Sequence, residues 1–214
     1  MTRAWMGCLH AGWIAPLWFA LAVWLAGLRI GYDPALRAVG DLGAVDAPRA
    51  ALFNIAGFVI PGVLMLVFAV ALEKVMTRDG AGRAGRLGTG LLMISSVAFA
   101  AQGVFPFDPD EPEGLTSQRH ASTLAFAILG LMAGALLVAA SLRRVAGWRV
   151  LTRFGPALAG VLLVFLAQPP QAWLPMLEGR VGHAQRVVFA IHLSWFALAA
   201  IVALGRERTA SLRR

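Results

Sequence analysis

The sequence predicts an all-α integral membrane protein, a bundle of six transmembrane helices with both termini on the cytoplasmic side of the membrane. Its 214 residues are 59% apolar and only 14% charged, and the mean hydropathy is +0.72. An ordinary soluble domain carries about 25% charged residues, so the composition excludes that class. Six long apolar runs, and the distribution of basic residues between them, complete the prediction.

Six apolar runs are long enough to cross a hydrocarbon core about 30 Å thick, which takes roughly 20 residues of helix. The spans are expected at about 11–30, 50–72, 85–105, 120–141, 150–168 and 185–204. The connections between them are too short to fold as separate soluble units. Residues 1–214 are therefore predicted to form a single integral membrane domain.

The first three runs carry features that bear on how they pack. The first follows Arg3 and is long enough to act as an uncleaved anchor. In the second, Pro61 is expected to kink the helix and to free a carbonyl that a neighbour must satisfy. In the third, Ser95 and Ser96 are expected to bond carbonyls of their own helix.

The last three runs differ in how strongly they predict a span. The fourth contains Gly130 and Gly134, a small-xxx-small pair that lets another helix approach closely. That helix belongs either to a second copy of the chain, which would give a homo-oligomer, or to the same bundle. The fifth is the weakest, because Arg153 and Pro156 lie near its start, where Pro is tolerated and Arg can reach the headgroups. The sixth is uninterrupted.

The basic residues lie mainly in alternate connections. Thirteen of the 19 Lys and Arg residues lie in the N-terminal segment, in 73–86, in 142–153 and in the C-terminal tail, together with 3 of the 11 acidic residues. Cytoplasmic loops are enriched in Lys and Arg, so both termini are predicted to be cytoplasmic. The net charge of +8 is thus explained by topology, and no nucleic-acid partner is expected. The expected location is the bacterial cytoplasmic (inner) membrane.

Three sequence stretches carry a resemblance to a known family. They are YDPALRAVGDLGAVDAPRAALFNIAGFVIPG, GVFPFDP followed by His120, and GHAQRVV at the start of the sixth run. In this order and spacing they resemble a family of bacterial and archaeal six-helix membrane proteins catalogued as domain of unknown function 998. The resemblance implies the architecture, and it brings no established activity, cofactor or catalytic residue.

Polar side chains within the spans gather in the outer half of the predicted bundle. Five of them are expected to line an outward-facing pocket, and three charged residues are expected at its mouth. The five are Asn54, Gln102, His120, Gln185 and His192, and the three are Asp41, Asp108 and Arg186. Polar groups in a membrane span are costly and often functional. The alternative is that they bond one another and stray carbonyls, and so tie the helices together.

The same residues do not predict a metal centre or a catalytic site. His120, His183, His192 and Asp108 are of the right types for zinc, but their spacing places no set of ligands on one helix face. No Gly-x-Ser-x-Gly nucleophile motif is present in the sequence. No metal and no cofactor are therefore expected, and the sequence assigns no catalytic residue.

Three function classes stay open. The favoured one is the binding or movement of a small amphiphile or lipid through the outward-facing polar pocket, with the lipid bilayer as the general partner. The second is an intramembrane metal-assisted lipid hydrolase, which would use a metal-bound water against an ester or amide. The third is a structural or accessory membrane subunit, which fits the lack of a sharp motif.

Overall fold

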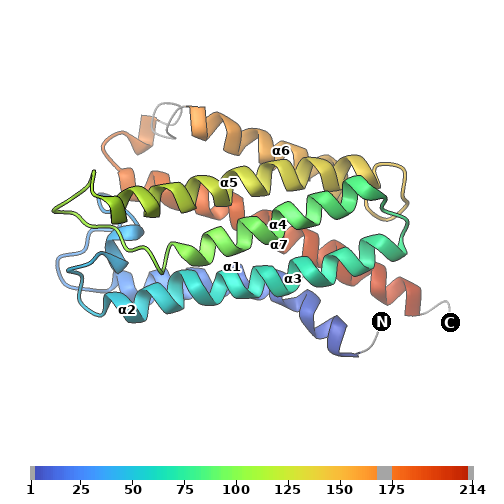
Figure 1. Ribbon diagram of the computed structural model, residues 1–214, viewed down its shortest axis with the longest axis horizontal. Coiled ribbons are helices and arrows are strands. Elements are labelled where there is room, and N and C mark those ends of the chain that lie inside the picture. Colours follow the sequence, from blue (N-terminus) through green and yellow to red (C-terminus); the bar gives the residue numbers. More distant parts are fainter. Residues whose placement is uncertain (1–2, 168–174, 212–214) are drawn as a thin grey trace.

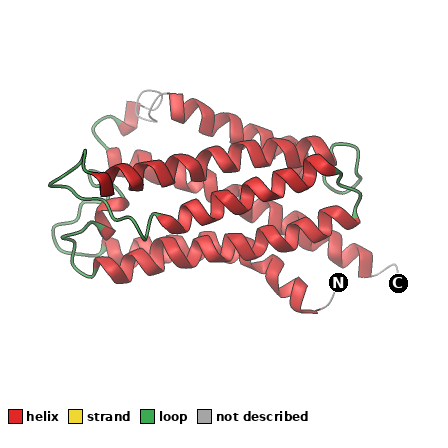
Figure 2. Cartoon of the chain, viewed as in Figure 1, coloured by secondary structure: helices red, strands yellow, loops and turns green. Residues whose placement is uncertain are grey.

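The structure, a computed structural model, describes residues 3–167 and 175–211. Over these residues the chain forms helices joined by loops (Figures 1 and 2). The elements in chain order are α1 (Arg3–Gly27), η1 (Gly40–Gly43), α2 (Ala50–Phe53), η2 (Asn54–Val59), α3 (Ile60–Arg78), α4 (Arg83–Ala101), α5 (Leu115–Leu142), α6 (Arg149–Ala167), η4 (Pro175–Leu177) and α7 (Val181–Ser211).

Within the described residues, six helical segments are long and apolar enough to cross a membrane, which confirms the predicted bundle of six transmembrane helices. Their bounds are Trp5–Gly27, Ala50–Arg78, Arg83–Ala101, Leu115–Leu142, Arg149–Ala167 and Val181–Ala210. They run side by side along the long axis of the molecule (Figure 1). Both termini lie at one end, here called the termini end, with the loops 79–82 and 143–148. The loops 28–49 and 102–114 lie at the opposite end, here called the long-loop end.

Several helices extend further at the termini end than the apolar runs predict. The second span continues from residue 72 to Arg78, and the last continues from residue 204 to Ser211. Ion pairs explain both extensions. Asp79 accepts hydrogen bonds from Arg78 (2.9 Å) and from Arg206 of α7 (2.9 Å), and Arg78 also pairs with Glu207. Charged residues thus continue the helices by pairing with one another.

The second span contains a π-helix at the position where Pro61 interrupts the hydrogen-bond ladder. The Ile60 N–H bonds the carbonyl five residues back, at Ile55. The next carbonyl, at Ala56, lacks a donor in this register because Pro61 has no N–H. The Trp18 Nε1–H of α1 donates to this carbonyl at 2.9 Å. The prediction that a neighbour must satisfy a carbonyl freed by Pro61 is therefore confirmed.

Helices α4 and α5 approach closely because glycines line their contact. A methyl group on Gly134 would lie 2.9 Å from the Gly88 carbonyl oxygen, and one on Gly130 would lie 3.0 Å from the Leu91 carbonyl oxygen. The glycine pair therefore packs against α4 within one chain, and an interface between copies stays a prediction. Across this contact Ser95 donates to the Ala127 carbonyl at 2.6 Å.

The two adjacent serines differ in their partners. Ser96 Oγ donates to the Leu92 carbonyl of its own helix at 2.7 Å, as expected. For Ser95 the expectation is wrong, because its hydroxyl bonds α5 instead. The close helix approach brings a carbonyl of the neighbouring helix within reach of this hydroxyl.

An aromatic cluster joins four segments in the half of the bundle nearer the long loops. It consists of Phe19 (α1), Phe58 (η2), Phe99 (α4) and Phe189 (α7), and all six pairs of rings have centroids 5.1 to 6.4 Å apart. The four side chains are almost completely buried. Such edge-to-face and tilted contacts stabilise a packed core. This cluster fixes the positions of the helices that carry the polar side chains.

Candidate functional site

Three of the five polar side chains predicted to line a pocket converge on one turn of the first long loop. Asn54 Nδ2 donates to the Gly43 carbonyl at 2.9 Å. Gln185 Oε1 accepts the Val39 N–H at 2.6 Å. His120 lies between these contacts, since a methyl group on Gly40 would lie 3.1 Å from its Nε2. The segments η2, α7 and α5 thus hold residues 39–43 against the end of the bundle.

His120 also anchors the second long loop. Its Nδ1 lies 2.8 Å from the Phe105 carbonyl oxygen, which can only accept, so Nδ1 carries the proton in this bond. The ring packs edge-on against Phe58, at 6.0 Å between centroids, and contacts Phe107 at 6.4 Å. One side chain therefore connects α5, the aromatic cluster and both described long loops.

Within the described residues, the other two polar side chains make no hydrogen bond to that turn. Gln102 is fully buried and its Nε2 reaches only the Phe99 carbonyl, at 3.5 Å. His192 is buried, and its ring stacks on Phe99 with centroids 5.7 Å apart. Within the described residues, Gln102 Oε1 and His192 Nε2 have no hydrogen-bond partner. The structure therefore brings three of the five together at the turn, while Gln102 directly follows α4 at the long-loop end and His192 lies within α7.

The three charged residues predicted at the mouth belong to different parts of the long-loop end. Asp41 accepts from Arg37 Nε at 3.3 Å, within the first loop. Asp108 lies in the second loop, where its carboxylate accepts the N–H groups of Asp110 and Glu111. Arg186 lies on α7 and binds the first loop. Two of the eight predicted site residues line a cavity: Asp41 lines a small one of about 130 Å³ within the first loop, and Arg186 lines a larger one.

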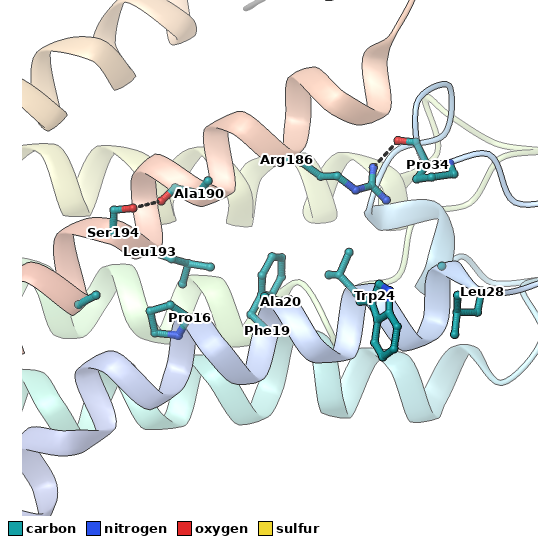
Figure 3. A pocket seen from close by; sticks show the side chains of 13 residues that line it. Pro16, Phe19, Ala20, Trp24, Leu28, Pro34, Arg186, Ala190, Leu193 and Ser194 are labelled. Atoms are coloured by element: carbon teal, nitrogen blue, oxygen red, sulfur yellow. Dashed lines mark hydrogen bonds between the residues drawn. The ribbon is translucent and has the colours of Figure 1, made fainter.

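That cavity is a groove between α1 and α7 with a volume of about 670 Å³. Figure 3 shows it lined by apolar side chains of both helices, with Arg186 at one end, where its guanidinium bonds the Pro34 carbonyl. The lining residues on α1 run from Pro16 to Gly27, eleven positions, or about 16 Å of helix. Half of a hydrocarbon core about 30 Å thick is about 15 Å. The length of the groove therefore matches the depth of one leaflet.

Sequence reasoning did not find this groove, although a weak signal is present. On α7 the lining residues Ala190, Ser194 and Ala197 recur at helical spacing, and on α1 Ala20 and Gly27 are seven apart. Small residues at such spacing normally mark a face where helices pack closely. Here the same face is left partly open. A signal of this kind does not distinguish a tight contact from a groove.

Hydrogen bonds at the end of the groove involve Tyr32 as well as Arg186. Arg186 Nη2 donates to the Tyr32 hydroxyl at 2.7 Å, and that hydroxyl donates to the Ala38 carbonyl at 2.9 Å. Burial raises the pKa of Tyr32, and the hydrogen bond from Arg186 opposes this effect without reversing it. The hydroxyl therefore keeps its proton, and its two hydrogen bonds connect the Arg186 guanidinium to the first loop.

No group of three or more His, Cys, Asp or Glu side chains placed to hold a metal ion occurs in residues 3–167 and 175–211.

The six apolar helices of spanning length in the described residues define a multi-pass membrane protein. Residues 13–202 match the model of the family described as "Protein of unknown function (DUF998)". The chain belongs to this family, which confirms the resemblance seen in its sequence motifs. No curated protein and no solved structure matches the chain.

Proposed function

We propose that the protein binds a lipid or similar amphiphile of the bilayer in the groove between α1 and α7. The observation that carries this proposal is the groove itself, which is apolar, as long as one leaflet is deep and closed at one end by a cation. Ligand sites are typically concave, mostly apolar and about 300–1,000 Å³ in volume, with a few polar groups that fix orientation. A hydrocarbon chain along the groove, with its polar end near Arg186, fits this description.

The polar cluster has a supporting role in this proposal. Asn54, His120 and Gln185 hold the first long loop, and this loop supplies Pro34 to the end of the groove. Polar side chains that tie a loop to a bundle in this way correspond to the structural alternative considered for the cluster. The pocket lined by the cluster is the second candidate, and the unpartnered atoms of Gln102 and His192 favour it.

Filling the groove tests the proposal. Ala190 lines the groove and is exposed, and Ala133 is an exposed alanine on α5 that does not line it. Native mass spectrometry of protein purified in mild detergent should show bound lipid in the wild type and in Ala133→Trp, and a loss of that lipid in Ala190→Trp. Equal lipid in all three proteins refutes the groove as the site.

The same measurement separates the groove from the polar pocket. If the pocket binds the ligand, His120→Ala and Asn54→Ala lose it while both proteins stay folded. If these side chains are structural, both variants unfold more easily, and only Ala190→Trp loses the bound lipid.

We also propose that the termini end faces the cytoplasm of a bacterial cell and that the groove opens toward the outer leaflet. The support is the predominance of Lys and Arg in the termini and in the loops at that end. A reporter that is active only in the cytoplasm, fused to the C-terminus, should be active. An inactive cytoplasmic reporter and an active periplasmic one would overturn the orientation.

A further inference from the structure

We infer that the amphiphile in the groove is an anionic phospholipid whose phosphate is bound by the edge of Arg186 formed by Nε and Nη2. The inference rests on the proposed function and deepens it by naming the ligand class. The inference depends on the hydrogen bonds that Arg186 makes, on the N–H donors that it leaves unused, and on the charges around the guanidinium.

The Arg186 guanidinium donates hydrogen bonds to neutral acceptors through Nη1 and Nη2. Its Nη1 donates to the carbonyls of Pro34 (2.8 Å) and Gly182 (2.9 Å), with Arg37 further away at 3.3 Å. Its Nη2 donates to the Tyr32 hydroxyl. A guanidinium has five N–H donors. Within the part of the chain that the structure describes, Nε donates to no residue, and one donor of Nη2 remains.

The remaining donors have the geometry that an oxyanion requires. Nε–H and the outer Nη2–H of a guanidinium point in the same direction and match two oxygens of a phosphate or carboxylate. The other donors bind the first loop and the Gly182 carbonyl of α7, and so fix the plane of the guanidinium. Because Arg186 lines the groove, we place this free edge at the end of the groove, where a headgroup would lie.

The charge balance around Arg186 also favours an anion. No acidic side chain in the described ranges forms an ion pair with Arg186; Asp41, in the first loop, is paired with Arg37. Arg29, also in the first loop, is likewise bound by a carbonyl, that of Leu42, at 2.9 Å. Positive charge near the membrane is costly unless it is paired or hydrated. A lipid phosphate would supply the missing negative charge.

The groove accounts for the rest of the ligand. From Arg186 it continues past Ala190 and Leu193 to Ala197, eleven residues or about 16 Å along α7. A headgroup at Arg186 thus has its chain directed toward the middle of the bilayer, which is the orientation of a lipid in its own leaflet. A free phosphate would gain the contacts at Arg186 but none along the groove, so we commit to the lipid.

The test compares two phospholipids that share acyl chains. Full-length protein in detergent is mixed with equal amounts of dioleoyl phosphatidylglycerol and dioleoyl phosphatidylcholine, and the bound species are counted by native mass spectrometry. We expect a preference of about tenfold for phosphatidylglycerol, equivalent to about 1.4 kcal/mol. Arg186→Gln should remove the preference while total bound lipid persists, and Ala190→Trp should remove both lipids.

Two further variants keep the test decisive if Arg186→Gln does not fold. Arg186→Lys keeps the charge without the two-donor edge and should retain only part of the preference. Tyr32→Phe removes one acceptor of Arg186 and should retain the full preference. A full preference in Arg186→Lys and Arg186→Gln overturns the inference but leaves the groove intact. Displacement of bound lipid by excess inorganic phosphate also overturns the inference, because such a result shows that the site binds an anion without needing an acyl chain.

If Ala190→Trp binds both lipids as the wild type does, the proposed function fails, and the inference fails with it.

Discussion

Replacing Asp79 by Asn should destabilise the protein substantially, because this carboxylate joins three segments at the termini end. Asp79 Oδ2 accepts from Trp148 Nε1 (2.9 Å) and from Arg206 Nε (2.9 Å), while Oδ1 accepts from Arg78 (2.9 and 3.0 Å). The Asp79 side chain is only 5% exposed, and Trp148 is completely buried. The carboxylate thus satisfies donors from α7 and from the α5–α6 loop at once.

The magnitude follows from the donors that the substitution leaves without an acceptor. Asparagine presents its amide nitrogen either to Trp148 and Arg206 or to Arg78, so in both orientations two N–H donors lose their acceptor. An unsatisfied buried donor costs about 1–3 kcal/mol. The weakened charge pairing adds to this, although both arginines are about 30% exposed and water reduces that part. We expect a total of about 3 kcal/mol, or a fall of about 6–12 °C in Tm for a chain of this size.

The assay is thermal unfolding in detergent, followed by intrinsic tryptophan fluorescence. Asp110→Asn is the matched control, since Asp110 is an exposed acid in the second long loop and its carboxylate accepts no hydrogen bond within the described residues. The control should unfold within about 1 °C of the wild type. If Asp79→Asn also does, the network contributes nothing and the reasoning is refuted.

The pH dependence provides an independent check. Burial alone would raise the pKa of Asp79, but the hydrogen bonds from Trp148, Arg78 and Arg206 together outweigh it, and the pKa is lowered below its ordinary value of 3.8. A lowered pKa in the folded state stabilises the fold above the unfolded value and loses that contribution as the pH falls through the folded value. The difference between wild type and Asp79→Asn should therefore be constant above about pH 5 and shrink below about pH 4.

Three other substitutions test separate parts of the bundle. Trp18→Phe should lower the free energy of unfolding by about 1–2 kcal/mol, because it removes the donor to the carbonyl left free by Pro61. In a Pro61→Ala background, where a backbone N–H returns, this loss should disappear. A double-mutant cycle of Tm values checks both results. Gly134→Ala should lower stability by about 1–3 kcal/mol through overpacking, whereas Gly160→Ala, where an added methyl meets open space, should not; a Gly134→Ala protein that stays stable but changes oligomeric state would favour an interface between copies. Gln185→Leu should release the first long loop, seen as faster proteolytic cleavage within it, and cleavage at the wild-type rate would contradict that role.

The fold class could be predicted because length and apolar composition alone determine which segments can cross a membrane. The ends of the helices were less predictable, because ion pairs such as Arg206–Asp79 extend them beyond the apolar runs. No pattern within a single helix indicates such pairs, since their members lie 127 positions apart in the sequence. The sequence predicted that the glycine pair marks a close helix contact. Only the fold identified α4 as the helix that packs against it.

The candidate site was predictable only in part, for a physical reason. The polar residues stand out in sequence because they are rare in apolar runs, so Asn54, His120 and Gln185 could be identified. Their partners are backbone groups of the turn at residues 39–43, and backbone groups carry no sequence signal. The groove is harder still, because it arises where side chains of α1 and α7 fail to fill the space between the helices.

The π-helix at Asn54–Val59 changes how the second span should be compared between relatives. An α-helix turns by about 100° per residue, so one extra residue in the ladder rotates everything on its far side by that amount. With the π turn present, Asn54 is buried and bonds Gly43, while Leu52 is exposed. A homologue that lacked one residue in this stretch would align almost perfectly by hydropathy. Its amide, however, would face a different neighbour, and the first long loop would lose its anchor.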